Sequence, residues 1–278
     1  MIVHQCKTLE DVLYLLTQYE NCKIIAGGTD IIIQMREKKI SPEVLIDISK
    51  VEELRKIQEN DRFIEIGSAV TFSDVVNSPV FEGKLHGFKK ACRLVGSPQI
   101  RNRGTIGGNI VNGSPAADSI PPLLCLNSTL VFKSFRGVRE VKLEDYFKYT
   151  DQIGIKKDEV LTAIRFRKPI GYLEFAKLGL RKALAISRIS MAAMVHLDGD
   201  GRIRDIAVAS GSLGKYPMRE RKVEEYLLGK TLNKRTVEES LEVLRKSTDE
   251  RLKGRSTYPY KRRAVERLFK EVLREVES

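Results

Sequence analysis

Two short glycine-rich segments are the places where this chain could hold a phosphate group. The first (residues 24–30, IIAGGTD) runs from an apolar strand into the start of a helix, and the second is Thr105-Ile106-Gly107-Gly108-Asn109. Backbone N–H groups at such turns lack helical partners and carry partial positive charge, and glycine removes the side chain that would block an anion. The alternative for the first segment is a plain turn capped by Thr29 or Asp30.

A carboxylate follows the second segment, at Asp118 in the run SPAADS (114–119). Two loops that each offer N–H donors would suit a diphosphate held from two sides, and Asp118 could accept hydrogen bonds from ribose or ribityl hydroxyls. Its alternative role is the N-cap of a helix over residues 119–126. Neither loop fits G-x-G-x-x-G or G-x-x-x-x-G-K-[ST], which disfavours a Rossmann site and a P-loop. The residues alone therefore predict a two-loop nucleotide cleft.

Hydrophobic periodicity predicts the elements that position these loops. Strands are expected at 23–26, 44–48, 63–66, 130–132 and 160–166, and helices at 9–19, from about 30, at 72–80 and at 87–95, with a helical link near 51–57. Residues 96–118 lack periodicity and are expected to be ordered irregular backbone. A hairpin at 189–197 and 203–209 and helices at 218–228, 237–246 and 260–276 complete the chain. This pattern predicts an α+β protein divided into residues 1–57, 58–168 and 169–278, with a linker at 168–171.

Composition narrows the class of protein. The net charge is +12, but basic residues alternate with acidic ones, which is typical of solvated helix faces and does not favour nucleic-acid binding. There is no secretory leader and no long apolar run, so we expect a cytoplasmic chain without membrane insertion. The four cysteines form no C-x-x-C pair and the three histidines are dispersed, so we expect reduced thiols, no metal site and no iron–sulfur ligands.

Longer motifs resemble the flavin subunits, or flavin domains, of molybdenum hydroxylases such as xanthine, carbon-monoxide and nicotine dehydrogenases. They are AGGTD (26–30), GSPQIRNRGTIGGNIVNGSPAADS (96–119), KLGLRKALAISRIS (177–190), GSLGKYPMRERKVEEYLLGK (211–230) and TYPYKRRAVERLF (257–269). The resemblance implies the vanillyl-alcohol-oxidase/PCMH-type fold, in which two N-terminal α/β subdomains hold FAD and a C-terminal α+β domain covers the flavin ring.

The resemblance also implies which residues contact FAD. The diphosphate would be held by Ile25, Ala26, Gly27, Gly28, Thr29, Asp30 and Ile31 in the first loop and by Thr105, Gly107, Gly108 and Asn109 in the second. Asp118 would contact the sugar chain, Val95 and Ile100 would lie near the adenine or the ring, and Leu161 would border the flavin.

Lys177 would lie by the pyrimidine edge of the flavin, where a cation stabilises negative charge on the reduced ring. The alternative is a lysine at a strand end with its charge in water. Tyr258 and Tyr260 could stack on a flavin, but we favour a role in anchoring the last helix. Arg181 and Arg188 could contact either FAD or a partner subunit, and we assign them no role.

The function implied is that of an electron-output subunit without catalytic side chains of its own. FAD would take electrons from a [2Fe–2S] small subunit, which receives them from a molybdopterin large subunit, and NAD would be the acceptor, in a dimer of heterotrimers. The whole complex is expected to be a purine hydroxylase of the xanthine dehydrogenase type. Alternatives are the flavin subunit of a carbon-monoxide or N-heterocycle dehydrogenase, a self-sufficient flavin oxidase, and a basic scaffold without FAD.

Overall fold

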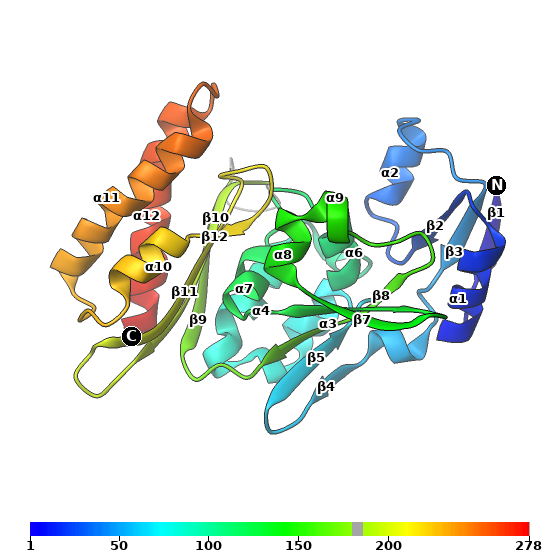
Figure 1. Ribbon diagram of the computed structural model, residues 1–278, viewed down its shortest axis with the longest axis horizontal. Coiled ribbons are helices and arrows are strands. Elements are labelled where there is room, and N and C mark those ends of the chain that lie inside the picture. The colour runs from blue at the N-terminus through cyan, green and yellow to red at the C-terminus, as the bar shows by residue number, and fades with distance from the viewer. Residues whose placement is uncertain (180–185, 278) are drawn as a thin grey trace. The chain divides into compact units, whose positions relative to one another are not determined.

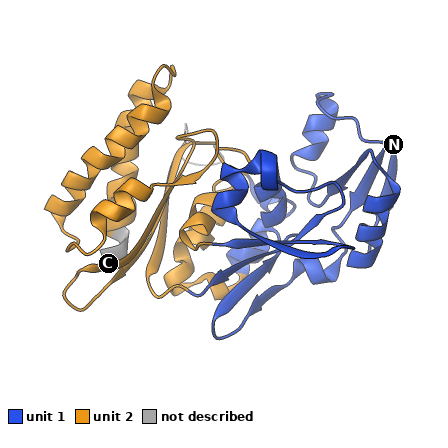
Figure 2. Cartoon of the chain, in the orientation of Figure 1, with its two compact units in different colours: residues 1–77, 97–112, 128–168 blue, residues 78–96, 113–127, 169–278 orange. Residues whose placement is uncertain are grey.

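The computed structural model describes residues 1–179 and 186–277, with the backbone alone described for residues 275–277. The chain divides into two compact units that interleave along the sequence (Figure 2). Unit 1 consists of residues 1–77, 97–112 and 128–168, and unit 2 of residues 78–96, 113–127 and 169–278. Among the described helices, none is both long and apolar enough to cross a membrane.

Unit 1 begins with a parallel three-stranded sheet of order β1-β3-β2. The elements of this part are β1 (Ile2–Gln5), α1 (Leu9–Gln18), β2 (Cys22–Ile25), α2 (Ile31–Arg36) and β3 (Val44–Asp47), as Figure 1 shows. The helix α1 begins at a capping box, in which Thr8 Oγ1 accepts from the Asp11 N–H and Asp11 Oδ2 accepts from the Thr8 N–H. Its buried leucines and valine recur at helical spacing and pack on Val44 and Ile46.

The second part of unit 1 is a five-stranded sheet of order β4-β5-β8-β6-β7 with antiparallel neighbours. Its strands are β4 (Ile57–Glu59), β5 (Phe63–Gly67), β6 (Thr129–Ser134), β7 (Gly137–Lys142) and β8 (Val160–Arg167). Its helices are η1 (Glu52–Arg55), α3 (Phe72–Asn77), α5 (Pro98–Arg101), α6 (Ile106–Asn112), α8 (Leu143–Lys148) and α9 (Thr150–Ile153).

Unit 2 is built on an antiparallel four-stranded sheet of order β12-β11-β10-β9. Its strands are β9 (Tyr172–Gly179), β10 (Ser187–Leu197), β11 (Ile203–Gly211) and β12 (Met218–Arg219). Its helices are η2 (Pro79–Phe81), η3 (Gly83–Leu85), α4 (His86–Arg93), α7 (Ile120–Cys125), α10 (Arg221–Leu227), α11 (Lys234–Leu252) and α12 (Tyr258–Glu277). The last helix packs on β9 and β10 through Val265, Leu268 and Phe269, which belong to a buried cluster.

The α+β prediction is confirmed, as are the predicted hairpin and most predicted strands and helices. Two expectations were wrong. Residues 96–118 contain the short helices α5 and α6, where Ser97 caps a Pro98 start and the helices are too short to show a period. The predicted helix at 218–228 begins only at Arg221, because Met218 and Arg219 pair with β11 as β12. The three-part division of the chain stays a prediction.

Candidate functional site

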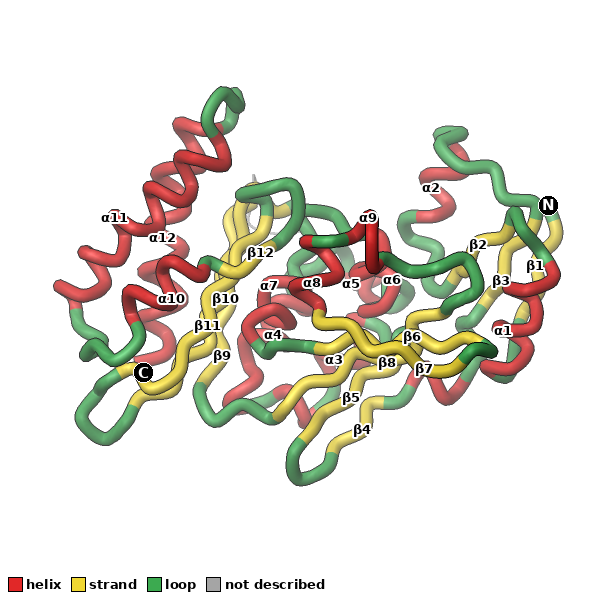
Figure 3. The backbone as a smooth tube through the Cα atoms, viewed as in Figure 1, coloured by secondary structure: helices red, strands yellow, loops and turns green. Residues whose placement is uncertain are grey.

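The first glycine loop lies between β2 and α2 (Figure 3). In the described part of the chain, the N–H groups of residues 27–30 make no hydrogen bond. Gly28 has a φ of +77°, which only glycine adopts without strain and which turns the chain into α2. A Cβ on Gly27 would lie 1.9 Å from the Arg103 carbonyl oxygen, so glycine is needed for the close approach of these two backbones. The loop is therefore shaped to offer a row of N–H groups to an anion.

Asp30 does not cap α2 through its side chain. Its Oδ1 instead accepts a hydrogen bond from Asn112 Nδ2 at 3.2 Å, and Gln34 Nε2 donates to Asn112 Oδ1 at 3.2 Å. The alternative reading of Asp30 as a side-chain cap was therefore wrong. These contacts tie the helix that follows the first loop to the end of α6, the helix that carries the second loop.

The second loop, at the start of α6, uses its N–H groups internally. The N–H of Ile106 donates to the Val70 carbonyl at 2.9 Å and that of Gly107 to the Ser68 carbonyl at 3.0 Å. The N–H of Gly108 donates to Thr105 Oγ1 at 3.0 Å. The expectation that both loops offer free N–H donors therefore holds for the first loop and is wrong for the second. The remaining donors of this loop are side-chain groups, among them the Thr105 hydroxyl.

Both loops line one cavity of about 620 Å³ that lies wholly within unit 1. A volume of this size suits a cofactor. The predicted residues that line it are Ile25, Ala26, Gly27, Gly28, Thr29, Asp30, Ile31, Thr105, Gly107, Gly108, Asn109 and Leu161. Their contact with FAD stays a prediction, but the structure places all twelve around one space.

Glu159, which lines this cavity, forms an ion pair with Arg139. Arg139 Nη2 lies 2.6 Å from Glu159 Oε2, and Arg139 Nε donates to Glu159 Oε1 at 2.9 Å. Burial raises the pKa of Glu159, but the bonds from Arg139 and the Lys156 N–H outweigh it, so the pKa lies below its ordinary value. Three lysines, Lys23, Lys156 and Lys157, line the same space and favour an anionic ligand.

Asp118 and Lys177 form a buried ion pair inside unit 2. Lys177 Nζ donates to Asp118 Oδ2 at 2.7 Å and to the Leu94 carbonyl at 2.8 Å, and Ser187 Oγ donates to Asp118 Oδ1 at 2.5 Å. Burial raises the pKa of Asp118 above its ordinary value, although Lys177 and Ser187 oppose the shift. The cap of α7 is Ser119, so the alternative of Asp118 as a helix cap was wrong, and so was that of Lys177 as a solvated strand-end lysine. The predicted contacts of both residues with FAD stay predictions.

The other predicted residues that the structure describes are not among those that line the unit 1 cavity. Val95 follows α4 in unit 2, and Ile100 is an exposed residue of α5 in unit 1. Tyr258 packs against the buried cluster of unit 2, as expected, whereas Tyr260 is 49 % exposed. Arg188 is an exposed residue of β10, and Arg181 lies outside the described residues.

Some residues that were not predicted from the sequence also line the cavity, notably Ser68 after β5 and Phe72 at the start of α3. The signal that could have found Ser68 is the small-residue run Gly67-Ser68-Ala69 at the end of a strand, the same signature that marks the first loop. Gly67 is required there because a Cβ would lie 2.2 Å from the Leu54 carbonyl oxygen.

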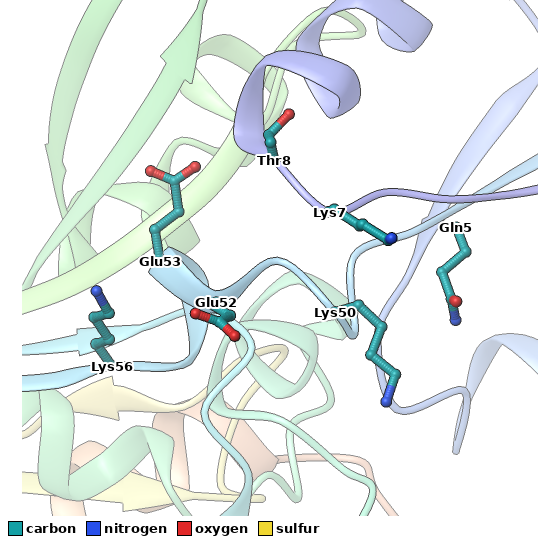
Figure 4. Close-up of a pocket in the computed structure, with 7 residues that line it drawn as sticks. All are labelled: Gln5, Lys7, Thr8, Lys50, Glu52, Glu53 and Lys56. Carbon is teal, nitrogen blue, oxygen red and sulfur yellow. The ribbon is translucent and has the colours of Figure 1, made fainter.

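A second hollow of unit 1, of about 630 Å³, lies near the start of α1 (Figure 4). It is lined by Gln5, Lys7, Thr8, Lys50, Glu52, Glu53 and Lys56. Glu53 accepts from the Leu9 N–H at 2.9 Å and Thr8 caps the same helix, so two of its polar groups are already used to stabilise α1. Glycine loops are absent from its lining, and the mixture of lysines and glutamates favours no single ligand charge.

The thiols offer no alternative chemistry. All four cysteines are free; Cys6, Cys92 and Cys125 are buried and Cys22 is half-buried. Burial raises the pKa of each thiol, to about 11 for Cys6 and about 12 for Cys125, which keeps them protonated near neutral pH. Within the described ranges, no group of three or more metal-ligating side chains occurs.

The residues of the unit 1 cavity fit the diphosphate of FAD. The unpaired N–H groups of the first loop are the donor set that a diphosphate requires. Lysines on the lining compensate the negative charge of the ligand.

Two family models match the chain. The model described as the FAD binding domain in molybdopterin dehydrogenase matches residues 1–168, and that described as the CO dehydrogenase flavoprotein C-terminal domain matches residues 174–276.

Known proteins resemble the chain over nearly its full length. The nicotinate dehydrogenase FAD-subunit of Eubacterium barkeri is 36 % identical, covering 96 % of this chain and 92 % of its own. A putative xanthine dehydrogenase FAD-binding subunit of Escherichia coli K12 is 31 % identical, covering 98 % and 94 %. A solved structure of carbon monoxide dehydrogenase from Hydrogenophaga pseudoflava, lacking the Mo-pyranopterin moiety, superposes with a TM-score of 0.91 at 27 % identity, covering 99 % and 96 %.

Proposed function

This chain belongs to the family of FAD-binding subunits of molybdenum hydroxylases, and from that premise we propose that it takes electrons from an iron–sulfur partner and passes them to NAD. Its cofactor is FAD, and it is the flavin subunit of an oxidoreductase. The observation that carries the proposal is the single cavity lined by both glycine loops, with unpaired N–H groups along the first.

FAD supplies the redox chemistry when bound, and the protein supplies position and electrostatics. In this proposal the N–H groups of residues 27–30 hold the diphosphate, and the hydroxyl of Thr105 donates from the second loop. Lys177, held by Asp118 and the Leu94 carbonyl, keeps a cation in place for the pyrimidine edge of the flavin. Because the reaction passes electrons through the cofactor, no side chain need act as an acid or base.

The partners proposed are a [2Fe–2S] small subunit and a molybdopterin large subunit, in a dimer of heterotrimers in the cytoplasm. The support is that relatives of nearly equal length are named as FAD-subunits or medium chains of larger dehydrogenases. The four cysteines lie apart in the chain, so in this proposal the electrons reach FAD from iron–sulfur ligands on another chain.

The substrate of the whole complex is proposed to be a purine, as in xanthine dehydrogenases. A second candidate is a pyridine carboxylate, because the nicotinate dehydrogenase subunit is 36 % identical and the xanthine dehydrogenase subunit 31 %. Both are nitrogen heterocycles that are hydroxylated on another subunit, so this chain would perform the same electron transfer in either complex.

The test is an absorbance spectrum of the purified chain, followed by anaerobic reduction with NADH and isolation of native partners. Flavin bands, bleaching by NADH and co-purification of iron–sulfur and molybdenum subunits are expected. Reduction by an organic substrate in the absence of any partner would favour the self-sufficient oxidase instead. A colourless chain that does not take up FAD would favour the scaffold and overturn the proposal.

A further inference from the structure

We propose that the Ser68 hydroxyl binds a phosphate oxygen of FAD, on the side of the cavity where the N–H groups of the second glycine loop are occupied. This inference rests on the proposed FAD site in unit 1. It assigns a binding role to a residue outside both glycine loops.

The main chain of Ser68 is fixed on both sides. Its N–H donates to the Thr162 carbonyl at 2.9 Å, and its carbonyl accepts from the Gly107 N–H at 3.0 Å. The next residue, Ala69, donates to the Leu54 carbonyl at 2.8 Å. The segment is therefore joined to β8 and to the second loop by backbone bonds, and the side chain is the only part of Ser68 free to turn.

The hydroxyl itself has no partner. Ser68 is 4 % exposed, and its Oγ makes no hydrogen bond in the part of the chain that the structure describes. A buried hydroxyl without a hydrogen bond costs free energy that alanine would avoid at the same position. Such groups are rare in native structures and call for a ligand or another partner.

Ser68 also lies where a phosphate would be expected. A Cβ on Gly107 would be 2.6 Å from the Ser68 Cβ, so the two residues are in direct contact and line the same cavity as residues 27–30. Oγ is buried as it stands, and a turn about χ1 moves this single atom to another staggered position without moving the backbone. The bound phosphate would then receive N–H donors from the first loop and hydroxyl donors from Ser68 and Thr105.

The experiment compares Ser68→Ala with the wild-type chain after FAD has been removed. Ser128→Ala is the matched control, because Ser128 is buried in unit 1, its Oγ also lacks a partner, and it does not line the cavity. Binding of FAD, ADP and riboflavin is measured by titration calorimetry, and thermal unfolding is recorded without ligand.

Ser68→Ala should weaken both FAD and ADP about tenfold or more, the loss that a hydrogen bond to a charged group produces. Riboflavin should be unaffected. Without ligand, both variants should unfold at the wild-type temperature or above it, because each removes an unsatisfied hydroxyl. Ser128→Ala should bind all three ligands normally.

Other outcomes separate the possible failures. Unchanged FAD and ADP affinity in Ser68→Ala would overturn the inference and leave the FAD site intact. A defect with riboflavin but not with ADP would move the contact to the flavin half and overturn the phosphate assignment. A wild-type chain that binds neither FAD nor ADP would instead refute the proposed function.

Discussion

The two glycine loops of unit 1 have similar compositions and opposite hydrogen-bonding roles. In the first loop the N–H groups of residues 27–30 are unpaired among the described residues, whereas those of Ile106, Gly107 and Gly108 in the second are all bonded within the protein. Gly28 adopts a left-handed backbone conformation that turns the chain, whereas Gly107 is needed because a side chain there would clash with Ser68. A pair of glycines therefore does not by itself identify backbone donors, because glycine serves a turn, a close packing contact or an anion equally well.

The strongest test of the first loop is Gly27→Ala. Its Cβ would lie 1.9 Å from the Arg103 carbonyl oxygen, so one of two backbones must move. FAD affinity should fall by more than about 100-fold and the free energy of unfolding by about 3 kcal/mol, at the upper end for an overpacked site. Fluorescence titration with FAD and chemical denaturation measure the two effects. The control is Gly199→Ala, whose Cβ would meet nothing within 4 Å. Near-normal FAD binding by Gly27→Ala would show that the first loop is not rigid.

Side-chain hydroxyls distinguish the loops more directly. Thr105→Val keeps the shape of loop 2 but removes the oxygen that accepts from the Gly108 N–H, and FAD affinity should fall about tenfold. Thr29→Val in loop 1 should change the affinity less than about threefold, because that loop binds through N–H groups. Equal losses in the two variants, measured by calorimetric titration, would remove the contrast between the loops.

Lowering the pH should weaken the ion pair between Glu159 and Arg139 while leaving both glycine loops unchanged. The pKa of Glu159 is lowered from 4.5, so its ion pair with Arg139 contributes stability above that pH and loses it as the pH falls through the lower, folded-state value. Glu159→Gln should therefore be less stable than wild type at pH 7 by about 1–3 kcal/mol, and the difference should shrink below pH 4.5. A difference independent of pH, in denaturant titrations at several pH values, would contradict the ion-pair explanation.

The smallest expected effect is that bound FAD protects Cys22 from alkylation. Cys22 begins β2, the strand that leads to the first loop, and lines the cavity. Burial raises the pKa of this thiol, so alkylation should need a higher pH than that of an unfolded cysteine. FAD should slow the reaction a few-fold, as followed by mass spectrometry of the labelled peptide. Unfolded chain serves as the reference, and equal rates with and without FAD would place the cofactor away from this end of the cavity.

Much of the fold followed from local patterns. The helix after Thr8 and the strand that begins at Val44 lie where apolar spacing indicated. The short helices at Pro98 and Ile106 were missed, since four and seven residues are too few to show a helical period. β7 and β9 were also missed, the first because alternating charges mask an edge strand.

The sequence indicated the two glycine loops that line the cavity but not the hydrogen bonds that their N–H groups make. Glycine pairs marked both loops, but which N–H groups remain unpaired depends on contacts with Val70 and Ser68, more than thirty residues away in the chain. The ion pair of Asp118 and Lys177 is of the same kind, since 59 positions separate its partners. Long-range pairs of this kind leave no local pattern in one sequence.

The interleaving of the two units constrains how the protein can be made. The chain passes from one unit to the other after residues 77, 96, 112, 127 and 168, so unit 1 is complete only once residue 168 has been synthesised. The helices α4 and α7, which belong to unit 2, leave the ribosome well before the β9–β12 sheet that they pack against. A fragment ending at residue 168 would expose the apolar faces of these helices, so cutting the gene at the boundary between its two family models should yield aggregation rather than a working flavin domain.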